Sequence, residues 1–130
     1  IIFLTEYSRN AILSIISNKT KNCIIIPHGI DGRFFCKPRE QKPTSKYNFS
    51  NPFRLVYIST VEPYKHQWNV VRAVCKLRKN NIPVALDLYG SSIAPMDNKL
   101  ELSINSCESA GGSIKYHGPA KHDNIHKLYI

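Results

Sequence analysis

The feature that most constrains the fold is an alternation of short apolar runs with segments of helical periodicity. The apolar runs read IIFLT, CIIIP, FRLVYIS, VALDLYG and SIKYHG, and within each run apolar residues follow one another closely. Such runs are typical of strands that are covered on both faces, as in a parallel sheet. The helical segments between them supply the crossover connections that parallel strands require. We therefore predict an α/β protein with a Rossmann-like parallel sheet and flanking helices.

The expected elements follow from this pattern. We expect strands near residues 1–4, 23–27, 54–59, 84–89 and 114–117, with the last three in one parallel sheet. Helices are expected near 6–17, 65–80 and 98–110, and a further one begins near 121. The helix near 65–80 has the clearest apolar face, formed by Trp68, Val71 and Cys75.

Residues 28–52 break the alternation. From residue 32 onward this part shows little periodicity and is interrupted by three prolines, and its stretch GRFFCKPREQKPTSK carries five Lys or Arg residues against the single acid Glu40. We interpret residues 28–52 as a linker or a long basic loop between two parts of the chain.

The charge of the chain favours anionic partners. Eighteen Lys and Arg residues against nine Asp and Glu residues give a net charge of +9. This balance suits nucleic acid, an anionic membrane surface or phosphorylated substrates, and it does not choose among them. The helix near 65–80 holds four cations, which form either a solvated face or a contact with an anionic membrane surface: Arg72, Lys76, Arg78 and Lys79.

Cysteine and histidine spacing argues against a metal site. The four cysteines form no C-x-x-C pair. Cys23 and Cys75 lie in apolar surroundings and are interpreted as buried thiols, which favours a reducing compartment and a cytoplasmic protein. Three histidines near the end of the chain invite a metal hypothesis, but no carboxylate or cysteine completes a ligand set, so no metal is expected.

The carboxyl ends of the predicted strands are where a parallel sheet binds its ligands. After the strand near 54–59, Ser59 and Thr60 offer hydroxyl and backbone N–H groups, and Lys65 stands where a helix begins. These groups form either a phosphate cradle or a turn with a solvated lysine, and both interpretations stay open. Gly90 closes the next strand, where it permits close approach by a ligand or simply makes a turn. The chain contains neither G-x-G-x-x-G nor a P-loop motif.

Three segments together resemble glycosyltransferase family 4, whose members have the GT-B fold. They read IPHGID followed by Phe34, then FRLVYISTVEPYKHQWNVVRAVCKLRKNNIPVALDLYG, then IKYHGPAKHDNIHKLY. The resemblance implies that residues 1–27 end an N-terminal acceptor domain, that 28–52 connect the domains, and that 53–130 begin the C-terminal nucleotide-sugar-binding domain. It covers nearly the whole chain, which on this view is a fragment of a longer protein.

The resemblance also implies a donor site. In the family an Arg and, five residues later, a Lys contact the donor diphosphate; Lys65 matches the Lys, whereas Thr60 stands in place of the Arg. The loop after KYHG is implied to lie near the nucleotide base. The donor-binding residues expected on these grounds are Ser59, Thr60, Lys65, Gly90, Gly118 and Pro119. The family's downstream paired glutamates are not in the chain, so no catalytic residue is assigned and the chain alone is expected to be inactive.

The function expected from the resemblance is transfer of a hexose from a nucleotide-diphosphate sugar to a glycan or lipid acceptor. The donor is a substrate, and no cofactor is expected. A cytoplasmic location is expected, with peripheral contact to the inner face of a membrane. Two alternatives stay open: a non-catalytic remnant, and a basic nucleic-acid-binding module, although no nucleic-acid motif is present.

Overall fold

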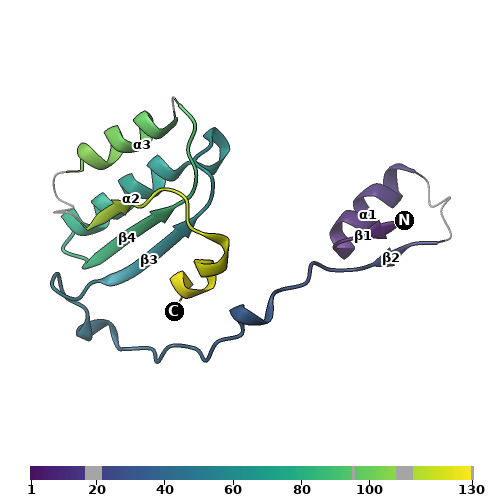
Figure 1. The fold of residues 1–130 in the computed structure, drawn as a ribbon, viewed down its shortest axis with the longest axis horizontal. Coiled ribbons are helices and arrows are strands. Elements are labelled where there is room, and N and C mark those ends of the chain that lie inside the picture. Colours follow the sequence, from purple (N-terminus) through teal and green to yellow (C-terminus); the bar gives the residue numbers. More distant parts are fainter. Residues whose placement is uncertain (17–21, 95, 108–112, 130) are drawn as a thin grey trace. The chain divides into compact units, whose positions relative to one another are not determined.

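The computed structural model describes residues 1–16, 22–94, 96–107 and 113–129 (Figure 1). The chain divides into two compact units, Ile1–Cys36 and Lys37–Ile130. Each unit has its own parallel strand pairing.

The first unit is a small β-α-β arrangement. Strands β1 (Ile2–Phe3) and β2 (Ile24–Ile25) pair in parallel, and α1 (Glu6–Ile15) follows β1. Thr5 begins α1, because its side chain accepts a hydrogen bond from the backbone N–H of Ser8 at 3.0 Å. Both strands are shorter than the predicted ranges 1–4 and 23–27, and no residue of α1 is buried.

The segment from Phe35 to Pro52 is irregular, as its lack of periodicity predicted. Two 3₁₀ turns, Gly32–Phe34 and Thr44–Lys46, are the helical pieces that the structure describes between β2 and the next full strand. Most side chains of this segment are exposed. Few apolar contacts hold it, which is the physical counterpart of its proline and lysine content.

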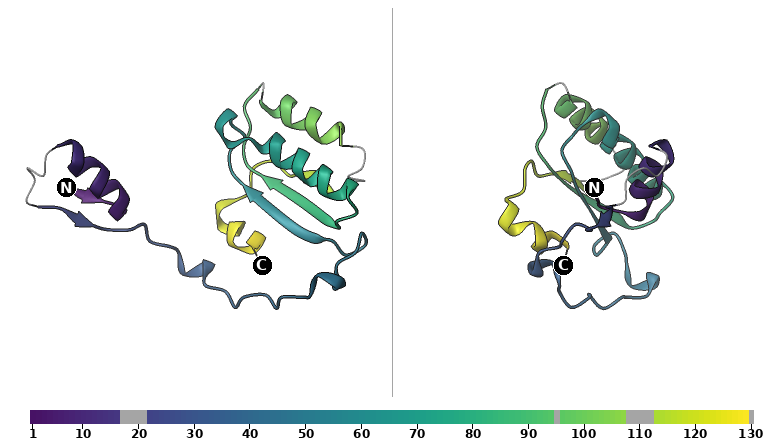
Figure 2. Two further views of the ribbon diagram at one scale, coloured as in Figure 1. Left: turned by 180° about the vertical axis from the view of Figure 1, so that it is seen from behind. Right: turned by 90° about the vertical axis from the view of Figure 1, so that its right-hand side faces the viewer.

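The second unit contains the predicted parallel sheet. Strands β3 (Phe53–Ile58), β4 (Val84–Tyr89) and β5 (Ile114–Tyr116) run parallel in the order β3-β4-β5. Helices α2 (Gln67–Lys79) and α3 (Met96–Asn105) both lie on one face of this sheet (Figure 2). This arrangement confirms the α/β fold class and the parallel pairing of the three strands.

The core lies between the sheet and these two helices. Val71 of α2, Leu86 of β4 and Leu100 of α3 are almost completely buried there. Trp68 is also buried, at 5% exposure, as the apolar face of α2 predicted. Because Leu86 and Leu88 face the helices, the side chain of Asp87 between them faces the opposite side of the sheet.

Two predicted helices differ from the observed ones. The helix expected from residue 65 begins at Gln67, because His66 has a left-handed backbone (φ 54°) and Lys65 belongs to a separate 3₁₀ turn, Pro63–Lys65. The helix expected near 98–110 spans Met96–Asn105, and residues 108–110 lie outside the described part of the chain.

The last element also differs in type. His122–Tyr129 is a 3₁₀ helix rather than an α-helix, and none of its residues is buried. Its apolar residues Ile125 and Leu128 are only half-buried, so tertiary packing gives little support to a wider α-helical turn there.

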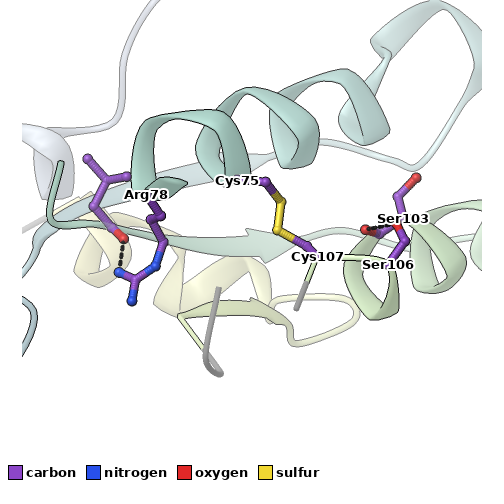
Figure 3. The surroundings of a disulfide bond; sticks show 6 residues. Cys75, Arg78, Ser103, Ser106 and Cys107 are labelled. Carbon is purple, nitrogen blue, oxygen red and sulfur yellow. Dashed lines mark hydrogen bonds between the residues drawn. A yellow bond between two sulfur atoms is a disulfide. The ribbon is translucent and has the colours of Figure 1, made fainter. Parts of the chain in front are cut away.

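A disulfide corrects the interpretation of Cys75 as a free thiol. Cys75 of α2 is bonded to Cys107, which follows α3, across 32 residues of sequence and a Cα–Cα distance of 5.9 Å (Figure 3). Cys23 is half-buried and takes part in no disulfide that the structure describes. Disulfides persist in oxidising compartments, so the cysteines no longer argue for a reducing one. The sequence did not reveal the pair, because only the packing of α2 against α3 brings the two residues together.

None of the described helices is long and apolar enough to cross a membrane.

Candidate functional site

The carboxyl ends of the three strands of the second unit meet at one edge of the sheet. The backbone N–H of Ser59 donates to the carbonyl of Tyr89 at 2.9 Å, and that of Gly90 donates to the carbonyl of Gly118 at 2.8 Å. The Tyr116 hydroxyl donates to the carbonyl of Gly90 at 2.8 Å. The structure therefore brings together three of the predicted site residues, Ser59, Gly90 and Gly118.

Gly90 is required by the protein's own backbone. Its φ is +150°, and a Cβ atom built there would lie 1.9 Å from the carbonyl oxygen of Ser59. No side chain fits this position, because the chain leaving β3 passes directly against it. The close approach at Gly90 is thus made by the backbone of Ser59 and Thr60.

Gly118 has a different environment. Its φ is +71°, in the left-handed region, yet a Cβ atom would meet nothing within 4 Å. Pro119, which follows it, is exposed. There is therefore open space beside the backbone of Gly118.

The turn between β3 and α2 is held by buried contacts on both sides. The Val61 N–H donates to the carbonyl of Ser91 at 2.8 Å, and Val61 is 4% exposed. The side-chain amide of Gln67, which is 2% exposed, donates to the carbonyl of Thr60 at 2.6 Å. The Tyr57 hydroxyl donates to the carbonyl of Lys65 at 2.9 Å. These bonds fix the backbone of the turn, so its polar groups are preorganised.

Lys65 projects from this fixed turn and lacks a carboxylate partner within the described residues. Its Nζ lies 5.0 Å from the centroid of the Tyr64 ring, a cation–π contact. The carbonyl of Lys65 is anchored by Tyr57, but its ammonium forms no ion pair with any carboxylate that the structure describes. The charge is thus available to an anion.

Glu62 is a residue of this turn that the sequence reasoning missed. Its carboxylate accepts a hydrogen bond from the Thr60 hydroxyl at 3.1 Å. A second hydrogen bond, from the Tyr64 hydroxyl to Glu62, raises the pKa of Tyr64. The hydroxyl hydrogen of Thr60 is therefore already donated to Glu62. What Thr60 offers to a ligand is its backbone N–H, which donates to no described residue. An acid three residues before Lys65 is the sequence signal that could have revealed this.

The N-terminus of α2 adds further donors. Its N-cap, His66, makes no side-chain hydrogen bond to the first turn, and the first turn contains no acidic residue. The leading N–H groups of a helix carry partial positive charge and suit an anion. The uncapped start of this 13-residue helix and Lys65, two residues before it in the sequence, each favour a nearby anion.

A second polar cluster lies on the sheet face opposite the helices. Asp87, 8% exposed, accepts one hydrogen bond from Arg54 at 2.5 Å and interacts with Nε2 of His117 at 2.7 Å. The His117 ring stacks on Tyr89 with centroids 4.4 Å apart. Burial raises the pKa of the Asp87 carboxyl, but the bonds from His117 and Arg54 outweigh it and leave that pKa below its usual value.

This cluster borders a cavity of about 330 Å³ that Arg54, Asp87, Tyr89 and Lys127 help to line. Asp87 was not among the predicted site residues. The signal was present, since an ionisable residue interrupts the apolar run VALDLYG. Because Asp87 already has two partners, the cluster is a satisfied ion-pair network rather than an acid or base awaiting a substrate.

The three histidines of the metal hypothesis do not converge. His117 is engaged with Asp87, whereas His122 and His126 lie on the 3₁₀ helix. With three residues per turn, positions four apart point about 120° away from each other, so His122 and His126 do not share one face of that helix. Among the residues that the structure describes, no group of three His, Cys, Asp or Glu side chains could hold a metal ion.

Comparison with known proteins gives two informative structural similarities. The chain is similar to the pneumococcal O-GlcNAc transferase GtfA, whose crystal structure contains UDP and GlcNAc, with a TM-score of 0.66 and 24% identity over 98% of this chain. It is also similar to TarM, with a TM-score of 0.61 and 16% identity over 94% of this chain. No protein-family model and no curated protein sequence matches the chain.

These likenesses confirm the fold, a part of the GT-B arrangement with parallel strands and flanking helices. The chain spans about a quarter of the length of each solved protein, at 24% and 22%.

Proposed function

We propose that the chain is part of a nucleotide-sugar-dependent glycosyltransferase and carries one side of its donor site. The observation that carries this proposal is the unpaired Lys65 beside the uncapped start of α2, at the sheet edge where β3, β4 and β5 end. The likeness in fold to a transferase crystallised with UDP and GlcNAc supports it.

The proposed chemistry follows from the charges. In glycosyl transfer the bond between the sugar's anomeric carbon and the diphosphate oxygen breaks, and the departing diphosphate gains negative charge. Preorganised N–H donors and a nearby cation stabilise that charge as it develops. Lys65 supplies the cation, and the first N–H groups of α2 together with the Thr60 N–H supply the donors.

Ser59, Gly90, Gly118 and Pro119 have a supporting part in this proposal. Gly90 shapes the edge by admitting the Ser59 backbone, and the open space beside Gly118 and Pro119 is where the base of the nucleotide would lie. Glu62 disfavours a phosphate near the Thr60 hydroxyl, so the diphosphate is expected closer to Lys65 than to that hydroxyl.

The remaining features of the proposal extend beyond the chain. We assign the parent protein to family 4, transferring a hexose to a glycan or lipid acceptor. Residues 1–27 would close its acceptor domain, 28–52 would connect the domains, and 53–130 would begin the donor domain. No cofactor is proposed, because the nucleotide sugar is a substrate.

Nucleotide binding to the 130-residue chain tests the proposal, because binding needs less of the site than transfer does. Titrations with UDP, GDP and ADP, followed by NMR chemical-shift changes, should perturb the amides of Thr60, Lys65 and Gly118 with at least one nucleotide. Lys65→Ala should weaken that binding about ten- to a hundredfold, the scale of one charged contact to phosphate.

Two controls make the result specific. The matched variant Lys115→Ala removes an exposed lysine from β5 and should bind like the wild type. The corresponding nucleoside, which lacks the diphosphate, should respond little to Lys65→Ala. Equal nucleotide affinity of Lys65→Ala and wild type would return Lys65 to a solvated surface position.

A further inference from the structure

A basic groove runs between α2 and α3, lined by residues of both helices. Its first part has a volume of about 310 Å³ and is lined by Arg72, Lys76 and Lys79 of α2 together with Ser103 of α3. Its second part, about 580 Å³, is lined by Lys99, Leu102 and again Arg72 and Ser103. The shared residues make the two parts one continuous groove.

The cations of the groove are aligned by helix geometry. Arg72, Lys76 and Lys79 are four and three residues apart, so they lie along one face of α2 over about 10 Å. The structure describes no carboxylate among the residues that line either part. Arg72 donates to the Asn69 side chain at 2.5 Å, and these three cations form no ion pair with a carboxylate in the part of the chain that the structure describes.

The disulfide gives the groove a fixed width. Cys75 and Cys107 form part of its lining, and Figure 3 shows Ser103 and Ser106 close to the bond between the helices. Since the two helices are covalently joined at this point, like charges on α2 are held in place without the groove opening.

The side chains between the cations indicate what kind of anionic partner fits. Leu102 is 69% exposed at the groove. Trp68, in contrast, is buried, and Lys99 covers its ring with Nζ 3.7 Å from the centroid. No stacking surface for a nucleic-acid base is therefore offered by Trp68, whereas cations surrounding an exposed leucine suit the headgroups and acyl boundary of a lipid surface.

We propose that the α2–α3 groove docks the protein on an anionic lipid surface. Arg72, Lys76, Lys79 and Lys99 contact lipid phosphoryl and carboxyl groups, and Leu102 inserts at the headgroup boundary. The interaction is electrostatic at long range, so it is strong at low salt and weak at high salt.

Vesicle sedimentation of the 130-residue chain tests the proposal. The chain should bind phosphatidylcholine vesicles that contain about one-third phosphatidylserine, and should not bind pure phosphatidylcholine. Because each Lys or Arg near such a surface strengthens binding about fivefold, the triple variant Arg72→Gln/Lys76→Gln/Lys79→Gln should weaken it roughly a hundredfold.

A matched triple variant controls for bulk charge. Arg39→Gln/Lys42→Gln/Lys46→Gln removes one arginine and two lysines from the irregular segment, the same charge change as in the groove variant. It should retain most of the vesicle binding. Equal losses in the two variants would mean that net charge alone holds the chain on the vesicles, and would overturn the groove as the docking surface.

A third variant separates a lipid surface from a soluble phosphate ligand. Leu102→Ser should weaken vesicle binding about three- to tenfold and leave binding of inorganic tripolyphosphate unchanged. If the groove binds tripolyphosphate but the chain binds anionic vesicles no better than neutral ones, its ligand is soluble and the lipid proposal is wrong. Circular dichroism of each variant checks that the fold is retained.

Discussion

Replacing Gly90 by alanine tests how the edge of the sheet is built. The added Cβ would lie 1.9 Å from the carbonyl oxygen and 2.5 Å from the carbonyl carbon of Ser59. Neither atom belongs to a flexible side chain, so the backbone after β3 must move. That movement strains the bond from the Ser59 N–H to the Tyr89 carbonyl and the bond from the Gly90 N–H to the Gly118 carbonyl.

The expected loss is large compared with the stability of a small domain. A non-glycine residue in this region of φ costs about 1–3 kcal/mol, and each weakened hydrogen bond costs about 1 kcal/mol more. We therefore expect Gly90→Ala to lower the free energy of unfolding of the second unit by about 3–5 kcal/mol. Trp68 is the single tryptophan of the chain and is buried in this unit, so its fluorescence during urea unfolding reports the loss.

Gly118→Ala is the matched control for this measurement. Gly118 also has a positive φ, but a Cβ there meets nothing within 4 Å. Gly118→Ala should therefore lower the free energy of unfolding only by the cost of a left-handed backbone at a non-glycine residue, about 1–2 kcal/mol. If Gly90→Ala proved no more destabilising than Gly118→Ala, the close packing of the β3 and β4 ends would not be what requires glycine, and the reasoning would be wrong.

Two further predictions concern stability. The pKa of the Asp87 carboxyl is below its usual value, so the stability that its carboxylate contributes is fully present above about pH 4 and is lost as the pH falls through the lower folded-state value. Asp87→Asn should lower the free energy of unfolding by about 1–3 kcal/mol at neutral pH and flatten the acid side of a stability–pH curve. An unchanged curve would contradict the role of Arg54 and His117. The Cys75–Cys107 bond closes a loop of 32 residues in sequence, so a reducing agent or Cys107→Ser should lower the free energy of unfolding by about 4 kcal/mol in urea titrations. Cys36→Ser, at an exposed free cysteine, is the control and should have little effect.

The local pattern of the chain explains which features the sequence could predict. The runs FRLVYIS, VALDLYG and SIKYHG are apolar because their strands are covered, and strands of this kind pair in parallel with helices as crossovers. The apolar stripe on α2 likewise follows from its helical period, which places Trp68 and Val71 in the core. The convergence of Ser59, Gly90 and Gly118 follows from the same topology, because parallel strands end at one edge.

Other features depend on contacts between distant parts of the chain. The start of α2 is set by the left-handed backbone of His66 and by the bonds that Tyr57 and Gln67 make to the preceding turn, and such bonds leave no periodic trace. The type of the last helix also escaped prediction, because α and 3₁₀ helices differ by the packing available to them.

The sequence by itself thus determined the parallel α/β layers, through apolar runs and helical periods that operate within a few residues. Only the tertiary structure decided that Cys75 is bonded to Cys107, that Asp87 has Arg54 and His117 as hydrogen-bond partners, and that the Thr60 hydroxyl donates to Glu62. The first two require elements about 30 residues apart to pack at one distance and orientation, which local propensity does not specify. The hydrogen bond from Thr60 to Glu62 requires one rotamer of each side chain in a turn whose backbone is fixed by the bond between Val61 and Ser91. It too therefore depends on a contact between distant parts of the chain.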